Sequence, residues 1–468
     1  MQSIKDIKRI AKWGHEVREQ AKAEKAIDFL ENNQADYMLE HYNKIYQTQN
    51  KKDAMRLNHK EFNLTEQLIS ELAICFRNGI DVEVMDKDQE DKSENAIKKE
   101  EILNDIIKNS LLLPTLKQID KYAELNKFCA LSVVYTEEGK FRLDIIPRSL
   151  CFVDQKKDNP KEFDAFYYQI GIFENSPRFA DSINRYQKVT AEEFVQVEVN
   201  VQTGTVIEIE STRIENPYGF IPIVDFIPEI RVDTYFPTTT SPIIDFNIAI
   251  NEELTDYRIT FSTQSFATMV VTGNITKGNL KIGQNAFINP QPISGMTGNP
   301  DAKYINPGID LDKLLSTIQR HCEMFANAVG VSSSLYNNTQ SDFSSGYQLM
   351  LSKSDIIQKA KDKIDFYQHS VQRLFDIITK MYDVHNENDT FENYTVKARI
   401  KDLNIEMSRG EELANDQIAI NMNVLSPIDI LMRDGLTEEQ ARERYEQIKT
   451  DNNMTVQSNI TTPNLEEI

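Results

Sequence analysis

The chain has little of the chemistry that marks enzymes and metalloproteins. Its 468 residues include one tryptophan, six histidines and four cysteines. The cysteines are far apart and form no CxxC pair: Cys75, Cys129, Cys151 and Cys322. Neither a disulfide framework nor a zinc site is expected from this spacing, so we interpret the cysteines as small buried hydrophobic residues.

Motifs for nucleotide binding and catalysis are also missing. The glycine- and lysine-containing stretch at 272–278 has the wrong order for a Walker A segment, and no GxGxxG, HExxH or GxSxG occurs. No two histidines stand at the spacing of metal ligands. We predict no catalytic site, no cofactor and no metal.

Segments that cross or enter membranes are not expected. No window approaches about 18 uninterrupted apolar residues, the length that a membrane-spanning helix needs. Residues 1–12 are charged throughout, whereas a signal peptide has a basic start followed by an apolar run.

Positive charge is in short supply. There are 52 basic and 73 acidic residues, which gives a net charge of −21. Tight DNA binders carry a basic face that displaces counterions from phosphate. Any contact of this chain with DNA should therefore be loose or confined to a small patch.

What the chain does have is enough apolar material for several domains, with 40% hydrophobic and 9% aromatic residues. A charged helix is predicted at 1–33, and apolar periodicity predicts further helices before residue 126, one of them interrupted at Pro114. Alternating apolar residues then predict a mostly antiparallel β region at 128–232. Its expected strands are 130–135, 141–146, 163–173, 194–201 and 206–209, with a hairpin turn at 202–204 and an apolar strand within 220–226 after a turn. A separate strand is expected at 80–84, ahead of this region.

Long amphipathic helices dominate the second half. Ser241 and Pro242 open one of them as N-cap and first-turn proline, and Asp310 and Gly330 bracket another. A third runs from about 346 to 384 and would be about 55 Å long. The shorter expected elements are strands at 267–271, 280–288 and 394–400, helices at 411–422 and from 426, a capping box at 437–440 and a disordered tail at 451–468.

This order of parts resembles the portal proteins of tailed bacteriophages over roughly residues 55–450. The segments that carry the resemblance are Asn216–Val224, similar to an Asn-x-x-Gly-x-Ile-Pro-Val segment; Ser241–Asn247 with Asn251 and Asp256, similar to a stem helix; Ala326–Ser332 followed by Ser345 and Gly346; and Leu425–Pro427 before a glycine and a helix. Each has a helix-cap or turn explanation of its own, but their order and spacing together are specific.

The resemblance implies an α+β portal fold with long stem helices, a β-rich wing, a small clip subdomain and a helical C-terminal crown. The implied parts are the wing at 1–240, stem helices at 241–266 and 309–330, the clip at 267–308, the tunnel loop at 331–345, the long helix and remaining wing at 346–423, and the crown with a disordered tail at 424–468.

The resemblance also implies a function that is not enzymatic. Such a chain would form a ring with about twelve copies of itself at one capsid vertex, as the conduit for double-stranded DNA. It would dock the terminase large subunit during packaging and head-completion or adaptor proteins later, and contact major capsid and scaffolding proteins. The implied location is the virion, with the host cytoplasm during assembly and no membrane.

Three groups of residues are candidates for this function. Neutral hydrogen-bonding groups in the loop could touch phosphate without reading sequence: Ser332, Ser333, Asn337, Asn338, Thr339 and Gln340. Carboxylates opposite the apolar stripe of the first stem helix could line the channel and keep DNA from sticking: Asp245, Glu252, Glu253 and Asp256. A patch in the clip could dock proteins: Lys277, Lys281 and Lys303. The alternatives are a plain solvated face for the carboxylates, and phosphate contact or solubility alone for the lysines.

Two other classes of protein remain open. One is a virion adaptor, scaffold or assembly protein with similar helices and no channel. The other is a DNA-processing enzyme, which would need a metal or nucleotide site. Oligomeric state separates the ring from the first, and nuclease or ATPase activity would indicate the second.

Overall fold

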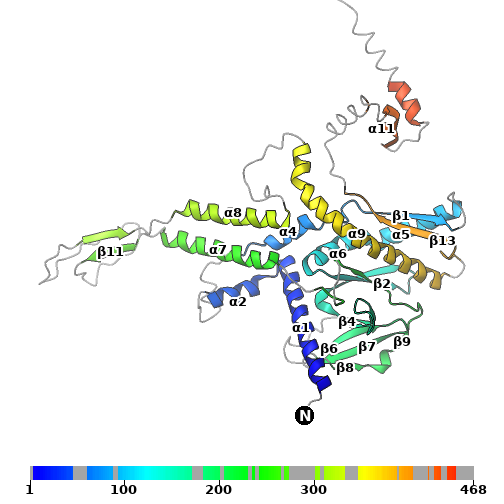
Figure 1. Ribbon diagram of the computed structural model, residues 1–468, viewed down its shortest axis with the longest axis horizontal. Helices are drawn as coiled ribbons and strands as arrows, with labels where there is room; N and C mark the ends of the chain where they lie inside the picture. The colour runs from blue at the N-terminus through cyan, green and yellow to red at the C-terminus, as the bar shows by residue number, and fades with distance from the viewer. Residues whose placement is uncertain are drawn as a thin grey trace, which may run out of the picture. The chain divides into compact units, whose positions relative to one another are not determined.

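The protein combines helices and antiparallel sheets (Figure 1). The computed structural model describes residues 4–45, 61–87, 93–170, 183–200, 205–229, 234–237, 242–264, 268–272, 301–305, 310–331, 346–386, 389–403, 420, 426–433 and 440–448. Contacts divide the chain into two compact units, residues 1–341 with 353–403, and residues 342–352 with 404–468.

A six-stranded antiparallel sheet forms the β-rich part of the first unit. Its order is β4-β5-β6-β7-β8, and β9 pairs with β7 beside β8. The strands are β4 (Cys151–Gln155), β5 (Phe163–Gln169), β6 (Ile183–Val189), β7 (Glu193–Asn200), β8 (Val206–Glu208) and β9 (Ile214–Glu215). Alternation along β7 buries Val195, Val197 and Val199 on one face. The long N-terminal helix α1 (Ile4–Leu30) reaches that face, where Trp13 packs edge-on against Phe152.

A buried arginine joins α1 to this sheet. Arg148, in the short 3₁₀ helix η1 (Arg148–Leu150), pairs with Glu16 at 2.7 Å and donates to the Cys151 carbonyl at 3.0 Å. Its guanidinium lies 3.8 Å from the ring centre of Phe236. A second short 3₁₀ helix, η2 (Glu210–Thr212), precedes β9.

Two smaller sheets share a core with three helices. One has the order β10-β2-β3, and the other pairs β1 with β13. The elements are β1 (Ile80–Asp86), β2 (Cys129–Tyr135), β3 (Phe141–Pro147), β10 (Ile223–Phe226), β13 (Tyr394–Ile400), α5 (Glu94–Asn109), α6 (Leu112–Asn126) and α9 (Gly346–His385). All of these elements contribute apolar residues to one cluster. Its centre holds Leu131 of β2, Leu116 of α6 and Leu374 of α9, each 0% exposed.

The outer edge of β13 is bonded by side chains of α9. Gln372 donates to the Val396 carbonyl at 2.9 Å and accepts from the Ala398 amide at 3.0 Å. Gln368 does the same for the Ala398 carbonyl and the Ile400 amide. Because β1 occupies the other edge, β13 is bonded on both sides.

Five helices build a second core around the end of α1. They are α1, α2 (Ala35–Ile45), α4 (Leu64–Leu72), α7 (Pro242–Gln264) and α8 (Leu311–Val329). The side chains of Asn63 and Asp310 cap α4 and α8 through the amides of Glu66 and Lys313. Between α7 and α8 the chain forms an antiparallel pair of strands, β11 (Thr268–Thr272) and β12 (Asp301–Ile305).

In the second unit, Ser426 caps helix α11 (Pro427–Arg433), and residues 440–448 are also helical. The predicted strand at 280–288, hairpin turn at 202–204, helix at 411–422, capping box at 437–440 and tail at 451–468 lie outside the described residues, save for Gln440 and for residue 420, which is helical.

The three long helices and the predicted strands are confirmed where the structure describes them, but one expectation about Pro114 is wrong. The break between α5 and α6 lies at Ser110 and Leu111, where Leu111 is left-handed with φ 54°. Pro114 sits inside the first turn of α6, because amides there have no acceptor within the helix and a missing N–H costs nothing. Strands β4, β6, β9 and β12 were not predicted.

Candidate functional site on the paired helices

Helices α7 and α8 lie side by side and antiparallel (Figure 1). The rings of Phe246 and Phe325 stack with centroids 3.9 Å apart and an interplanar angle of 6°. Further along the pair, His321 Nδ1 lies 2.9 Å from Glu253 Oε1. The predicted stem helices therefore do pack against each other within one chain.

The opposite flank of α7 is buried but polar. Asn247, Asn251 and Thr255, at steps of four, are each 0% exposed. The Asn251 side chain accepts from the Phe62 amide at 2.6 Å and donates to the Phe62 carbonyl at 2.9 Å. It thereby pairs with the extended segment before α4 as a neighbouring strand would.

The other two polar residues extend this contact in both directions. Asn247 accepts from the Leu64 amide at 2.9 Å, and Thr255 bonds the Tyr42 hydroxyl at 3.1 Å. In the sequence, Asn247 and Asn251 stand out only as part of the resemblance. The signal for their role was the four-residue spacing of small polar residues on a face that the apolar stripe left unused.

The structure separates the four predicted carboxylates of α7. Asp245 and Asp256 are exposed, and Glu252 and Glu253 are half-buried. Glu252 lies 3.3 Å from His41 of α2, whereas Glu253 contacts α8. Three of them share one side of the helix, but Glu253 lies about 60–100° away from them at 100° per residue.

The C-terminus of α8 is held by the long helix α9. Lys359 donates to the Val329 carbonyl at 2.7 Å, across Gly330, whose φ of +81° ends α8 in the left-handed region. A Cβ at Gly330 would lie 2.6 Å from Lys359 Nζ. The left-handed backbone requires glycine here, and a side chain at this position would also displace the Lys359 ammonium from its place.

One turn further along α9, Lys363 enters a buried cluster of charges. It donates to Glu124 of α6 at 2.7 Å and to the Leu72 carbonyl at the end of α4 at 3.0 Å. Asp120, one turn before Glu124, lies 4.0 Å from Lys363 and accepts from the Cys75 amide at 2.9 Å. The cluster ties α4, α6 and α9 together.

The environment moves the two carboxyl groups of this cluster in opposite directions. Burial raises the pKa of Asp120, and the Lys363 ammonium offsets only part of that effect. Burial also acts to raise the pKa of Glu124, but Lys363 and Lys127 outweigh it and the pKa is lowered. Glu124 is therefore the carboxylate that pairs with Lys363.

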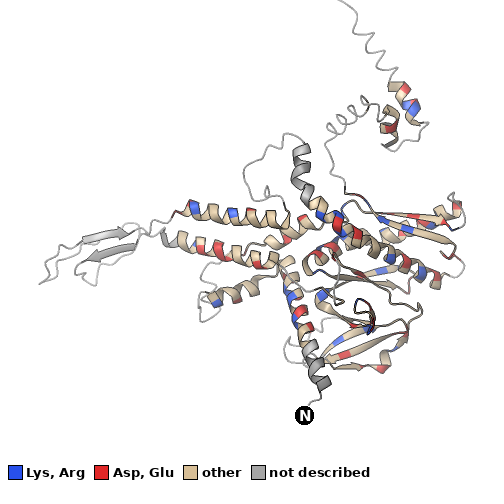
Figure 2. Ribbon diagram, in the orientation of Figure 1, with Lys and Arg blue, Asp and Glu red and all other residues tan. Residues whose placement is uncertain are grey.

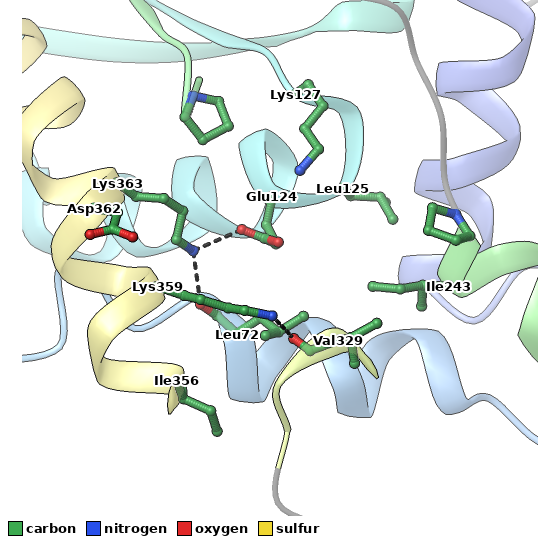
Figure 3. A pocket seen from close by; sticks show the side chains of 12 residues that line it. Leu72, Glu124, Leu125, Lys127, Ile243, Val329, Ile356, Lys359, Asp362 and Lys363 are labelled. Carbon is green, nitrogen blue, oxygen red and sulfur yellow. Dashed lines mark hydrogen bonds and ion pairs between the residues drawn. The ribbon is translucent and has the colours of Figure 1, made fainter. Parts of the chain in front are cut away.

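A cavity of about 400 Å³ lies where these elements meet (Figure 3). Leu72, Leu125 and Ile243 form apolar parts of its wall, and Lys359 and Lys363 point along it toward their partners. Since both lysines are engaged in contacts that join helices, the cavity marks a structural junction. Its lining includes no histidine, cysteine, serine or tyrosine.

The remaining candidate residues are less well placed. Ser332, Ser333, Asn337, Asn338, Thr339, Gln340, Lys277 and Lys281 lie outside the described residues. Lys303 is on β12, opposite Val270 of β11. The structure therefore fixes the two helices that flank the predicted tunnel loop, and places one of the three clip lysines on a strand.

No group of three or more potential metal ligands occurs within the described part of the chain, and no helix there is long and apolar enough to cross a membrane. All four cysteines are buried, and burial raises the thiol pKa of Cys151 to about 12 and of Cys322 to about 11.

Comparison with known proteins decides the family. A family model described as "Phage portal protein, SPP1 Gp6-like" matches residues 12–458. The chain belongs to this family of phage portal proteins. The match includes every helix and strand discussed above apart from the first turns of α1, and the family is structural and not enzymatic.

Two solved structures of gene transfer agent particles are similar to this portal family member. One is the neck of an empty particle computed with C6 symmetry, at TM-score 0.41 and 11% identity, covering 82% of this chain and 92% of that chain. The other is the virion of a native particle, at TM-score 0.40 and 11% identity, covering 82% and 89%. No curated protein matches the chain. The assignment rests on the family model.

Proposed function

We propose that the protein is the portal subunit of a tailed phage, assembled as a ring at one capsid vertex through which double-stranded DNA enters and leaves. The observation that carries this is the family match over residues 12–458. The antiparallel pair α7 and α8 is consistent with it, because two long helices repeated around an axis make a continuous wall.

The parts of the subunit follow from this proposal. Residues 241–266 and 309–330 are the stem, 267–308 with β11 and β12 are the clip, and 331–345 are the tunnel loop. Residues 1–240 and 346–423 make up the wing, and 424–468 the crown. The loop offers neutral hydrogen-bonding groups to phosphate, and the clip lysines offer a docking patch for proteins.

Its partners are other copies of itself, about twelve in a ring by the family resemblance, and the proteins that act at the vertex. We assign the terminase large subunit to packaging, head-completion or adaptor proteins to the later stage, and major capsid and scaffolding proteins to the shell around the ring. The chain is present in the host cytoplasm during assembly and in the virion afterwards.

Native mass spectrometry with negative-stain class averages tests the ring. A closed ring with a central hole is expected. A purified protein that stays monomeric even with its capsid and scaffolding partners would instead support an adaptor or assembly protein without a channel.

Deletion of residues 333–343 tests the tunnel loop separately. Val331 is 2% exposed and Lys359 holds the Val329 carbonyl, so the ends of the helices should keep their places. We expect rings to form and DNA packaging to fall. Loss of the ring itself would contradict the assignment of this segment to the channel.

A further inference from the structure

An exposed stripe runs along α8 on the side away from α7. Lys313, Arg320, Met324 and Asn327 follow at steps of seven, four and three, and all four are exposed. Met324 is 69% exposed, a large value for an apolar side chain in the middle of a 19-residue helix. We call these residues the α8 stripe. It combines two cations with an apolar side chain that has no cover in the single chain.

A second exposed stripe runs along α7. Asp245, Ala249, Glu252 and Asp256 follow at steps of four, three and four, and all but the half-buried Glu252 are exposed. We call these residues the α7 stripe. Figure 2 shows acidic positions along α7 and basic positions along α8. The two stripes are thus opposite in charge, and the α7 stripe has a small residue where the α8 stripe has a large one.

The contacts within one chain fix the relative heights of the two helices. Phe246 stacks on Phe325, and Glu253 meets His321, so these pairs mark two levels of the antiparallel pair. A rotation about an axis parallel to the helices moves a copy sideways and leaves every residue at its height. We take the axis of the proposed ring to be parallel to the two helices, and with that premise the same levels apply between α8 of one copy and α7 of the next.

At these levels the two stripes come into register. Counted from either marker at 1.5 Å per residue, Glu252 and Arg320 differ in height by about 1.5–3 Å. Ala249 and Met324 also differ in height by about 1.5–3 Å. Asp256 and Lys313 differ in height by about 3–8 Å, which is within the reach of a lysine side chain. The pairs that result are Ala249 with Met324, Glu252 with Arg320 and Asp256 with Lys313.

We propose that the α8 stripe docks against the α7 stripe of a second copy of this chain, with Arg320 paired to the neighbour's Glu252 and Met324 seated over its Ala249. The proposal rests on the proposed ring and adds the surface that closes it. Two different stripes on one subunit make a head-to-tail contact, which is the kind that closes into a ring.

The acidic side of α7 then faces the neighbouring subunit, and not the DNA path expected from sequence. Charge complementarity favours this placement. Arg320 of the neighbouring copy lies at the height of Glu252 and gives that carboxylate a cation to pair with, whereas a wall facing the open channel would give it none. The other charges of α8, Asp312 and Glu323, lie about 60° or more round the helix from Arg320. His41 contacts Glu252 from α2 of the same chain and leaves room for a second partner on a half-exposed carboxylate.

Charge exchange between two chains tests the contact. The variants R320E and E252R are each expected to lose the ring in native mass spectrometry, because each brings like charges together at every interface. Mixed in equal amounts, they should assemble again, since each then meets its opposite. The restored rings should hold an even number of subunits, with equal numbers of the two variants.

Two controls accompany this test. H41Q removes the partner of Glu252 within the chain and should leave the ring intact. Circular dichroism shows whether each variant is folded; if E252R is not, the exchange is made between Lys313 and Asp256, with K313E and D256K.

The outcomes separate this proposal from the proposed function. A wild-type chain that forms no ring with its capsid and scaffolding partners would overturn both. Rings formed by folded R320E and E252R as readily as by wild type would overturn the docking contact alone. If these variants form rings but package less DNA, the α7 stripe would be assigned to the wall of the channel, as the sequence led us to expect.

Discussion

Replacing Lys363 with methionine tests how the long helix is anchored. The side chain is 12% exposed, and those of its partners Glu124 and Asp120 are 15% and 1% exposed. Methionine keeps the length and apolar stem of lysine but removes the ammonium. The variant therefore leaves two carboxyl groups in the interior without their cation.

The expected loss is large for a single substitution. Removing one member of a buried ion pair costs about 3–5 kcal/mol, because the remaining charge stays desolvated and unpaired. The hydrogen bond from Lys363 to the Leu72 carbonyl is lost as well, and contributes about 1 kcal/mol of that figure. We expect the free energy of unfolding to fall by about 3–5 kcal/mol at neutral pH.

The loss should shrink as the pH falls. In the wild type the pKa of Glu124 is lowered, so its contribution to stability is present above the unfolded-state pKa and lost in acid. Without Lys363, burial is opposed only by Lys127 and Lys359 at Glu124 and by the Cys75 amide at Asp120, so the folded-state pKa of each carboxyl group is higher than in the wild type. A group with a raised pKa loses stability as the pH rises through it, so the variant is least affected in acid.

Urea unfolding followed by circular dichroism at about pH 5 and about pH 8 measures this difference. The matched control is K361M, two residues away on the exposed face of α9, which should change stability by less than about 0.5 kcal/mol. Adding E124Q to K363M should recover part of the loss. A deficit that is the same at both pH values, or no larger than that of K361M, would refute the reasoning.

Three further results are expected. G330A should lower stability by about 1–2 kcal/mol, because φ at Gly330 is +81° and the new Cβ meets Lys359. G14A in α1, where a Cβ would have nothing within 4 Å, should instead raise stability by about 0.5–1 kcal/mol. Thermal unfolding compares the two variants, and equal shifts of their midpoints would contradict this expectation. N251A should lower the free energy of unfolding by about 2–3 kcal/mol, because the amide and the carbonyl of Phe62 both lose their hydrogen bonds to the Asn251 side chain. N327A, at an exposed position of α8, should lower it by less than about 0.5 kcal/mol. Equal losses for the two variants in urea unfolding would show that Asn251 does not hold the segment before α4. Cys322, with a pKa of about 11, should have about a thousandth of its thiol ionised at pH 8, so a thiol reagent should label it only after unfolding; rapid labelling of the native protein would count against its burial.

Periodicity was enough to predict the helices that position the site. The apolar residues of α7, α8 and α9 recur at steps of three and four, and Asp310 and Gly330 supply a cap at each end of α8. Such signals are local, so they survive without knowledge of the neighbours. Strand β7, which alternates clearly, was predicted for the same reason.

Elements that depend on distant partners were missed. Strand β6 reads INRYQKV, with only three apolar residues, and is a strand because β5 and β7 pair with it on both sides. Strand β12 is likewise defined by its pairing with β11. Local propensity does not reveal such pairings.

The site shows the same division. Asn251 and Lys363 are polar residues beside apolar stripes, and sequence alone would place them in solvent. Their partners, Phe62 and Glu124, lie 189 and 239 residues away in the chain. The four carboxylates of α7 were expected as one face, and only the packing of α2 and α8 on either side shows that Glu252 and Glu253 meet different histidines.

The glutamines that bond β13 have a consequence for assembly. An open strand edge is a template on which a segment of another chain can pair, and a protein that gathers many copies at one place is exposed to that error. Gln368 and Gln372 occupy the outward amides and carbonyls of β13 with a helix from the same chain. Copies that meet at this edge find the Val396 and Ala398 carbonyls and the Ala398 and Ile400 amides already bonded, so this stretch of β13 does not offer them a ladder to extend.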